Sequence, residues 1–182
     1  NFANQIVPLF TKAGCNSGGC HGKSGGQNGF RLSLLGFEPQ EDYEYLVKEG
    51  RGRRLSPAAP ANSLLLLKAA AILPHGGGAR IEPNSYDYQL ITRWIAMGTP
   101  RGADTDPTVA GLEVYPKSRL VSANASQQIT VTAIYSDGHT EDATHIATYE
   151  ANDKEIAEVD DSGHVTFFEQ PGDVSVMIRY QG

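Results

Sequence analysis

The chain of 182 residues has 40% hydrophobic and 20% charged side chains, which is typical of soluble globular proteins, and its length allows one domain or two small ones. No apolar run reaches the roughly 18 residues that a membrane-spanning helix requires. The net charge of −6 is uneven, because residues 1–109 carry 11 Lys and Arg against 9 Asp and Glu, whereas residues 110–182 carry 4 against 12. The acidic second half argues against nucleic-acid binding, and the change in charge predicts two separate units.

The first half is expected to form short helices joined by glycine-rich loops. Apolar side chains recur at helical spacing in residues 3–13, where Pro8 either lies in the first turn or kinks the helix. Further helices are predicted over 39–48, 64–72 and 85–97, each ending shortly before a glycine or proline. Residues 22–29 contain four glycines and no apolar side chain, so this segment cannot form a core of its own.

The only two cysteines of the chain, Cys15 and Cys20, are separated by four residues, and His21 follows directly. Two thiols on a short loop beside an imidazole are the groups that attach a haem covalently and bind its iron. The familiar attachment signature has two residues between the cysteines, so this loop would be a lengthened variant. Two alternatives remain open: a Cys15–Cys20 disulfide, or a zinc site completed by His21 and His75.

If His21 is the proximal iron ligand, the ligand on the opposite side decides the chemistry. His75 is the predicted distal ligand, because it lies in a loop between the last two helices and three glycines after it let the backbone approach closely. Met97 is the alternative ligand, although its position late in a helix also suits packing. Two imidazoles give a lower potential than a His/Met pair and leave no open iron position, which favours electron transfer over catalysis.

A basic cluster follows the helix predicted over 39–48. Arg53 and Arg54 belong to this cluster together with Arg51. These arginines either form a solvated surface, or one of them pairs with a haem propionate. The second alternative is possible because arginine binds carboxylates through two parallel hydrogen bonds.

After a polar linker over residues 100–108, the pattern of apolar residues changes from helical to alternating. Strands are predicted over 128–135 and 174–180, and a hairpin over 156–168. Short strands separated by tight turns are typical of a β-sandwich. No cysteine is present in this half to join two sheets.

Both halves resemble known bacterial modules. The attachment loop with Gly22-Lys23 and the segments 27–30, 52–54, 74–78 and 93–95 make residues 7–100 similar to the cytochrome c-like domain of large planctomycete proteins. The segments 133–138, 141–144, 156–159 and 163–165 make residues 111–182 similar to a bacterial Ig-like domain of group 2. The resemblance implies one covalently bound haem c, a periplasmic or cell-surface location, and further domains C-terminal to these two.

We therefore predict a multidomain α + β protein with a small all-α cytochrome c-like domain over 1–102, a linker over 103–110, and an all-β Ig-like sandwich over 111–182. The predicted function is that of a mono-haem c-type electron-transfer module, not an enzyme, with a redox partner protein and no membrane span in this chain. The competing hypotheses are a surface or adhesion protein with a Cys15–Cys20 disulfide, and a haem enzyme such as a peroxidase with an open iron face. Because the chain begins at Asn1 without a signal peptide, we expect it to be part of a longer exported protein.

Overall fold

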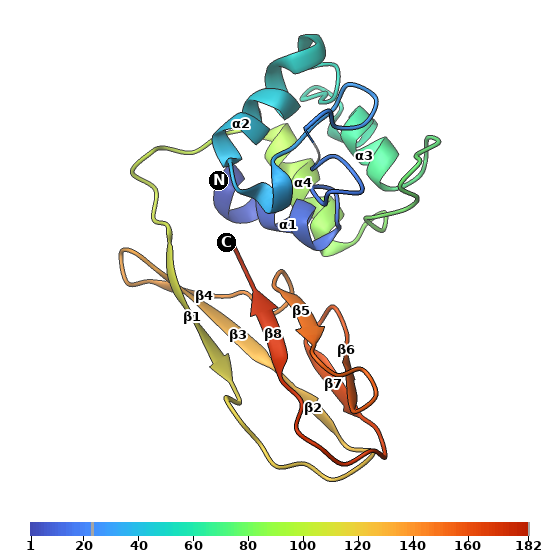
Figure 1. Cartoon of the computed structure of the whole chain (residues 1–182). Coiled ribbons are helices and arrows are strands. Elements are labelled where there is room, and N and C mark those ends of the chain that lie inside the picture. Colours follow the sequence, from blue (N-terminus) through green and yellow to red (C-terminus); the bar gives the residue numbers. More distant parts are fainter. Residues whose placement is uncertain (23, 182) are drawn as a thin grey trace. The chain divides into compact units, whose positions relative to one another are not determined.

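A computed structural model describes residues 1–22 and 24–181 and divides them into two compact units (Figure 1). The first unit comprises Asn1–Asp104 and the second Thr105–Gln181. Lys23, which belongs to a segment that carries the resemblance, and Gly182, the last residue of the predicted second domain, lie outside the described residues. Among the helices that the structure describes, none has both the length and the apolar character to cross a membrane.

Short helices and single turns make up the regular structure of the first unit. The α-helices are α1 (Val7–Lys12), α2 (Pro39–Tyr43), α3 (Leu64–Ala69) and α4 (Tyr86–Ala96). The unit also contains π and 3-10 turns, the first before α1 and the others between the α-helices: η1 (Phe2–Ile6), η2 (Leu34–Gly36), η3 (Glu44–Lys48), η4 (Glu49–Gly52) and η5 (Pro60–Asn62). Pro8 lies in the first turn of α1, where its missing N–H costs no helical hydrogen bond.

Helix α4 is the longest of the described helices and begins and ends at the signals that its sequence carries. The side chain of Ser85 accepts a hydrogen bond from the amide of Tyr88, which caps the first turn. Trp94 and Ile95 are buried, and Gly98, with φ of 82°, follows the C-terminus of the helix.

Aromatic rings hold α1, α2 and α4 together. The Phe2 ring lies 6.5 Å from that of Phe10, 5.4 Å from that of Tyr43 and 5.5 Å from that of Trp94, measured between centroids. The polar atoms of these rings have hydrogen-bond partners. The Tyr43 hydroxyl donates to the carbonyl of Thr99, and the Trp94 indole N–H donates to the carbonyl of Pro100. This cluster anchors the helices from which the glycine-rich loops emerge.

The predicted fold class is wrong for this unit, because a small all-α domain is not evident. The four α-helices span 5 to 11 residues each in the described chain. Between α1 and α2 the chain forms turns, an isolated antiparallel bridge between Gln27 and Phe30, and the short η2 turn. The physical reason is that residues 22–36 consist mainly of glycine and polar residues, so no apolar helical face forms.

Three small antiparallel sheets form the second unit. Strands β1 (Val109–Tyr115), β3 (Thr130–Tyr135) and β4 (Thr140–Asp142) make one sheet, β2 (Ser126–Gln128), β7 (His164–Phe167) and β6 (Ala157–Val159) a second, and β5 (Thr148–Ala151) and β8 (Val176–Arg179) a third. Mixed short helices and small sheets therefore replace the predicted combination of an all-α domain and a sandwich.

Alternate residues of β3 supply the core of the second unit. Val131, Ala133 and Tyr135 are buried, whereas the residues between them are more exposed, as a period of two requires. In the sheet that contains β2, β6 and β7, Ala157 and Val165 are buried and belong to the same hydrophobic cluster. Val176 and Ile178 of β8 pack against this cluster, so side chains from all three sheets contribute to one core.

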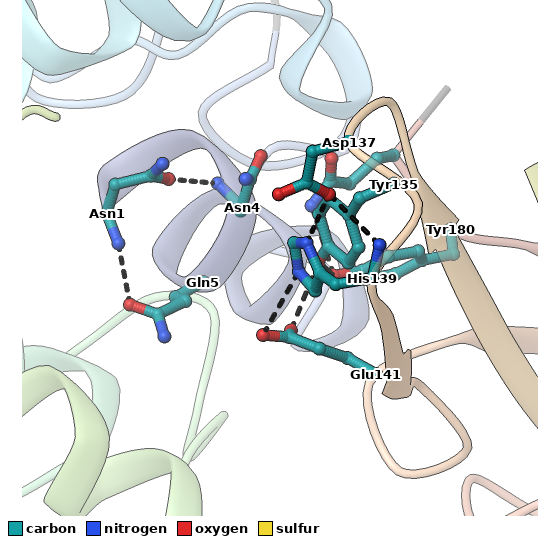
Figure 2. A network of polar contacts seen from close by, with 9 residues as sticks. Asn1, Asn4, Gln5, Tyr135, Asp137, His139, Glu141 and Tyr180 are labelled. Atoms are coloured by element: carbon teal, nitrogen blue, oxygen red, sulfur yellow. Dashed lines mark hydrogen bonds and ion pairs between the residues drawn. The ribbon is translucent and has the colours of Figure 1, made fainter. Parts of the chain in front are cut away.

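A polar network closes the turn between β3 and β4 (Figure 2). His139 Nδ1 lies 2.5 Å from the Asp137 carboxylate, and its ring stacks on Tyr135 with centroids 4.3 Å apart. The Tyr135 hydroxyl donates to Glu141 at 3.2 Å and lies 3.2 Å from the Tyr180 hydroxyl. Burial and the contact with Tyr180 raise the pKa of Tyr135, so this hydroxyl stays protonated across the physiological range.

Tyr149 makes the second unit sensitive to alkaline pH. Its hydroxyl donates to the Thr144 carbonyl at 2.7 Å, and burial raises its pKa to about 12. Because the folded-state pKa lies above the unfolded value of about 10, the stabilisation is complete below pH ~10 and is lost as the pH rises toward ~12. We expect urea unfolding monitored by tyrosine absorbance to show about 1 kcal/mol less stability at pH 11 than at pH 9 from this residue.

The Tyr149→Phe variant is the control, since it lacks the ionisable hydroxyl and keeps the ring. Its stability should change less than that of the parent between pH 9 and 11. Equal losses in both proteins would show that other groups cause the alkaline destabilisation.

Candidate functional site

The loop that carries the two cysteines is closed by its own backbone. The amide of His21 donates to the carbonyl of Cys15 at 2.9 Å, and the amide of Gly22 donates to the carbonyl of Ser17 at 3.0 Å. A Cβ on Gly22 would lie 1.9 Å from the carbonyl oxygen of Asn16, so only glycine fits at this position. The close turn brings the backbone of His21 back to Cys15.

The extra length of the loop projects into solvent. Gly18 and Gly19 are exposed, whereas Asn16 is 1% exposed and its carbonyl accepts a hydrogen bond from the amide of Leu35 at 3.0 Å. The buried residue fixes the base of the loop, and the two glycines form its outer part. The four residues between Cys15 and Cys20 are thus accommodated while the hydrogen bond from the His21 amide to the Cys15 carbonyl is kept.

His21 is held as a neutral imidazole with one nitrogen available. Its Nδ1 lies 2.9 Å from the carbonyl oxygen of Phe30, and a carbonyl only accepts, so Nδ1 carries the proton and Nε2 the lone pair. Burial lowers the pKa of His21, which keeps the ring uncharged at neutral pH. A hydrogen bond from the second ring nitrogen to a backbone carbonyl is the usual support of a metal-binding histidine.

His75 has the same arrangement in another loop. Its Nδ1 lies 2.8 Å from the carbonyl oxygen of Gly78, so Nδ1 carries a proton and Nε2 is not engaged by this hydrogen bond. A Cβ on Gly77 would lie 3.1 Å from Cε1 and 3.5 Å from Nε2 of the ring, so a larger residue there would crowd the nitrogen. The glycines after His75 therefore clear space around its free nitrogen.

The structure brings these two histidines together although 53 residues separate them in the chain. Their ring centroids are 6.2 Å apart and their planes differ by 11°. Two imidazoles that bind one metal ion from opposite sides, each at about 2 Å, have ring centres roughly 6 Å apart. The observed separation is compatible with that arrangement, and it also lies within the range of about 4.5–7 Å that packed aromatic rings adopt.

Both rings line one cavity with a volume of about 640 Å³, within the range of ligand-binding pockets. Its apolar wall includes Phe10, Phe30, Leu32, Leu64, Leu65 and Ala69, and its cationic residues are Arg53, Arg54, Lys68 and Arg80. None of its described lining residues is acidic. The cavity therefore suits a large, mostly apolar ligand that carries negative charge.

Both cysteines also line this cavity and are free thiols that are partly exposed. Burial raises the pKa of Cys15 to about 11, and the guanidinium of Arg80 partly opposes this rise. Cys20 Sγ accepts a hydrogen bond from Arg80 Nη2 at 3.9 Å. The predicted attachment residues thus lie at the same cavity as the two predicted iron ligands.

The two predicted arginines have different surroundings. Arg53 is exposed at the cavity, as a contact for a carboxylate requires. Arg54 is 5% exposed, and its guanidinium donates to the carbonyls of Tyr45, Glu49 and Gly29 at 2.5–2.8 Å. Its role is to tie three backbone segments together, so Arg53 remains the candidate propionate contact of the pair.

Arg54 is expected to contribute strongly to the stability of the first unit. In Arg54→Met, three carbonyls lose their donor, which should lower the free energy of unfolding by about 2–4 kcal/mol. Urea denaturation monitored by Trp94 fluorescence measures this loss. Arg53→Met is the neighbouring control and should change stability by less than about 0.5 kcal/mol because its side chain is exposed. Equal effects of the two substitutions would contradict the assignment.

Met97, the alternative ligand, follows α4 with a side chain 67% exposed and does not belong to the residues that line the cavity. In residues 1–22 and 24–181, no group of three or more His, Cys, Asp and Glu is placed to hold a metal ion. Of the candidate ligands, the structure brings together His21 and His75.

Sequence reasoning did not identify Arg80 and Lys68 as residues of this site. Arg80 comes just after the glycine loop of His75, and Lys68 lies in α3, where its Nζ donates to the carbonyl of Pro74. Neither belongs to a motif. The surplus of two positive charges in residues 1–109 was the only hint of a cationic site in this half.

Comparison of the chain with protein-family models gives no match, and comparison with curated proteins gives none either.

Proposed function

We propose that this chain is a mono-haem c-type electron-transfer module, with haem c bound through Cys15 and Cys20 and with His21 and His75 as the axial iron ligands. The observation that carries the proposal is the pair of nearly parallel imidazoles 6.2 Å apart, each with Nδ1 bound to a carbonyl, in one cavity with both thiols. The bound haem would supply a one-electron redox centre of low potential.

The residues of the cavity fit this group in three respects. The Nε2 atoms of the two rings would supply two metal ligands, and much of the cavity wall is apolar, as a porphyrin requires. The cationic residues match the two propionates, with exposed Arg53 as one contact. His21 and His75 would together hold the iron and leave no ligand position for a substrate, which favours electron transfer over a peroxidase-like reaction.

The resemblance of residues 7–100 to the planctomycete cytochrome c-like domain is part of the proposal, as sequence similarity confined to the quoted motifs and not as a likeness of an all-α fold. Covalent haem is attached outside the cytoplasmic membrane, so we propose a periplasmic or cell-surface location. We propose that the second unit, which resembles an Ig-like module, acts as a spacer or docking surface, and that electrons pass to a redox partner protein.

Export of the chain in a bacterium that attaches haem tests the function. We expect the purified, denatured protein to keep one haem by mass spectrometry, and its visible spectrum to be that of a six-coordinate, low-spin haem. A redox titration of the purified protein should be reversible and should involve one electron. A colourless protein two hydrogens lighter than its sequence would instead establish a Cys15–Cys20 disulfide and overturn the proposal.

A further inference from the structure

Three exposed apolar side chains lie within four residues of the chain, in the η2 turn and directly after it. Leu34 is 54% exposed, Leu35 is 48% exposed and Phe37 is 81% exposed. Single apolar side chains on a surface are normal, whereas a group of them marks a site of interaction. These three residues are called the apolar turn below.

The backbone of the apolar turn is tied to the cysteine loop and to α1. The amide of Leu35 donates to the carbonyl of Asn16 at 3.0 Å, and the Thr11 hydroxyl donates to the carbonyl of Leu35 at 3.3 Å. A Cβ on Gly36 would clash with the side chain of Val7, so the turn packs closely against α1. The backbone is therefore held in place while the apolar side chains stay exposed.

Leu35 adopts a backbone conformation that disfavours leucine. Its φ of 55° and ψ of 19° lie in the left-handed region, where the Cβ crowds the backbone and where glycine or asparagine is accommodated at lower cost. About half of the side chain is in solvent, so packing offsets this strain only in part. A residue that breaks a local rule with no matching gain for the fold points to a function outside the fold.

The apolar turn adjoins the loop through which the haem would be attached. A Cβ on Gly18, between the two cysteines, would lie 3.9 Å from Leu34 Cδ1. A protein that covers the apolar turn therefore also approaches the cysteine loop. Electron transfer slows steeply as the distance between redox centres grows, so this side of the first unit suits the approach of a redox partner.

The charges beside the apolar turn select the kind of partner. Residues 32–47 contain four acidic residues and no Lys or Arg. Glu38 and Glu41 are exposed, and neither takes part in the ion pairs that the structure describes. This acidic flank, Glu38 and Glu41, attracts a surface rich in Lys and Arg and repels an anionic lipid surface. A second copy of the chain, with its net charge of −6, is a poor match for the same reason.

We propose that the apolar turn and the acidic flank form the docking surface for a redox partner protein whose contact surface has an apolar centre and a rim of Lys and Arg. This inference rests on the proposed function and names the kind of partner that it requires. The apolar side chains supply contact area, and the acidic flank speeds and orients the encounter. Electron-transfer interfaces of this kind are small, so the complex is short-lived and sensitive to salt.

An NMR titration of the ¹⁵N-labelled full chain tests the proposal. The probe is an unlabelled, small basic cytochrome c whose haem edge is surrounded by lysines. At about 0.01 M salt, we expect the amide signals of residues 34–38 to shift or broaden, and at about 0.5 M salt we expect the effect to weaken, because the charges are screened. A parent chain whose signals of residues 34–38 do not respond would overturn the proposal without any variant.

Two variants and a matched control assign the parts of the surface. Phe37→Ser should weaken probe binding by about three- to tenfold, as loss of an aromatic contact predicts. The Glu38→Gln/Glu41→Gln variant should reduce the salt dependence of binding. Leu120→Ser removes another apolar side chain, 99% exposed, and should bind the probe as the parent does. Equal weakening in Phe37→Ser and Leu120→Ser would show non-specific adhesion and overturn the proposal.

Leu35→Asn separates docking from folding. Asparagine tolerates the left-handed backbone, so we expect the urea midpoint of the parent to be kept while probe binding weakens about threefold. A lower midpoint with unchanged binding would show that Leu35 serves the fold and would contradict the proposal. Shifts of residues 34–38 caused by concentrating the chain alone, or by phosphatidylglycerol vesicles, would assign the surface to a second copy or to a membrane and would also overturn it.

Haem content separates this inference from the proposed function. If the exported chain holds no covalent haem while residues 34–38 still respond to the probe, the electron-transfer function fails and the docking surface for a basic protein stands. If the haem-loaded parent and Phe37→Ser bind the probe equally and reduce it at equal rates, the docking surface fails and the proposed function stands.

Discussion

The Cys15→Ala/Cys20→Ala double variant is expected to lose all covalently bound haem. Both free thiols line the cavity, and the chain contains no other cysteine that could replace them. Extraction of the exported protein with acidified acetone should leave the parent coloured and remove all haem from the variant. Each single variant should keep one thioether bond and remain coloured, with a visible band displaced by the unreacted vinyl group.

The first unit itself should remain folded in the double variant, because its core is formed by other side chains, including Phe2, Phe10 and Trp94. Circular dichroism of the haem-free parent and the haem-free variant should therefore agree. If the double variant retained its haem after extraction, covalent attachment through these cysteines would be excluded.

The His75→Ala variant is expected to open one side of the iron. If His21 and His75 both hold the iron in the parent, as proposed, carbon monoxide should bind the reduced protein slowly, limited by release of a ligand. In the variant, one position accepts external ligands, and binding should be faster by at least about a hundredfold, since no protein ligand must dissociate first. Stopped-flow absorbance after mixing with carbon monoxide measures both rates.

Met97 provides the control for this experiment, because its side chain is 67% exposed and does not line the cavity. Met97→Ala should bind carbon monoxide as slowly as the parent. A parent spectrum with a Met-to-iron band near roughly 695 nm, lost in Met97→Ala, would assign the ligand to Met97 instead. His75→Met should raise the midpoint potential, within the roughly 0.8 V that axial ligation spans.

Elements with strong local signals were predicted well. Helix α4 was expected over 85–97 and spans Tyr86–Ala96. Its capping serine, its apolar face and the glycine after it all indicate the same helix. Strand β3 was recognised in the same way from its alternating residues. Strands β4 and β5 were missed, since three exposed polar residues and a four-residue strand carry no pattern that distinguishes them from loops.

The all-α prediction was wrong because the structure of the first unit depends on contacts between residues far apart in the chain. Glycine-rich segments were expected to join short helices into an all-α domain, but the segments themselves make up much of the unit. Their shape depends on tertiary hydrogen bonds, such as those of buried Arg54 to three carbonyls and of Ser33 to the buried Asp42 carboxylate. Such contacts join residues up to 25 positions apart, so a local pattern does not report them.

The candidate site was predicted from the chemistry of a few residues and not from a fold pattern. Cys15, Cys20 and His21 lie within a stretch of seven residues, and a single loop histidine, His75, was inferred as their partner. The structure places these four residues at one cavity. Arg80 was missed because its proximity to Cys20 depends on two backbone hydrogen bonds to Ala69, a tertiary contact without a sequence signal.

The hydrogen bonds from the His21 and His75 rings to the carbonyls of Phe30 and Gly78 have a kinetic consequence for the proposed module. A ring bonded at Nδ1 resists rotation and displacement when the charge on a bound metal changes. Electron transfer is slowed by the nuclear rearrangement that accompanies it, so ligands held in place in both oxidation states lower the reorganisation energy. Fast self-exchange between oxidised and reduced molecules, visible as line broadening of the imidazole signals in NMR spectra of mixed samples, is the behaviour that such anchoring would produce.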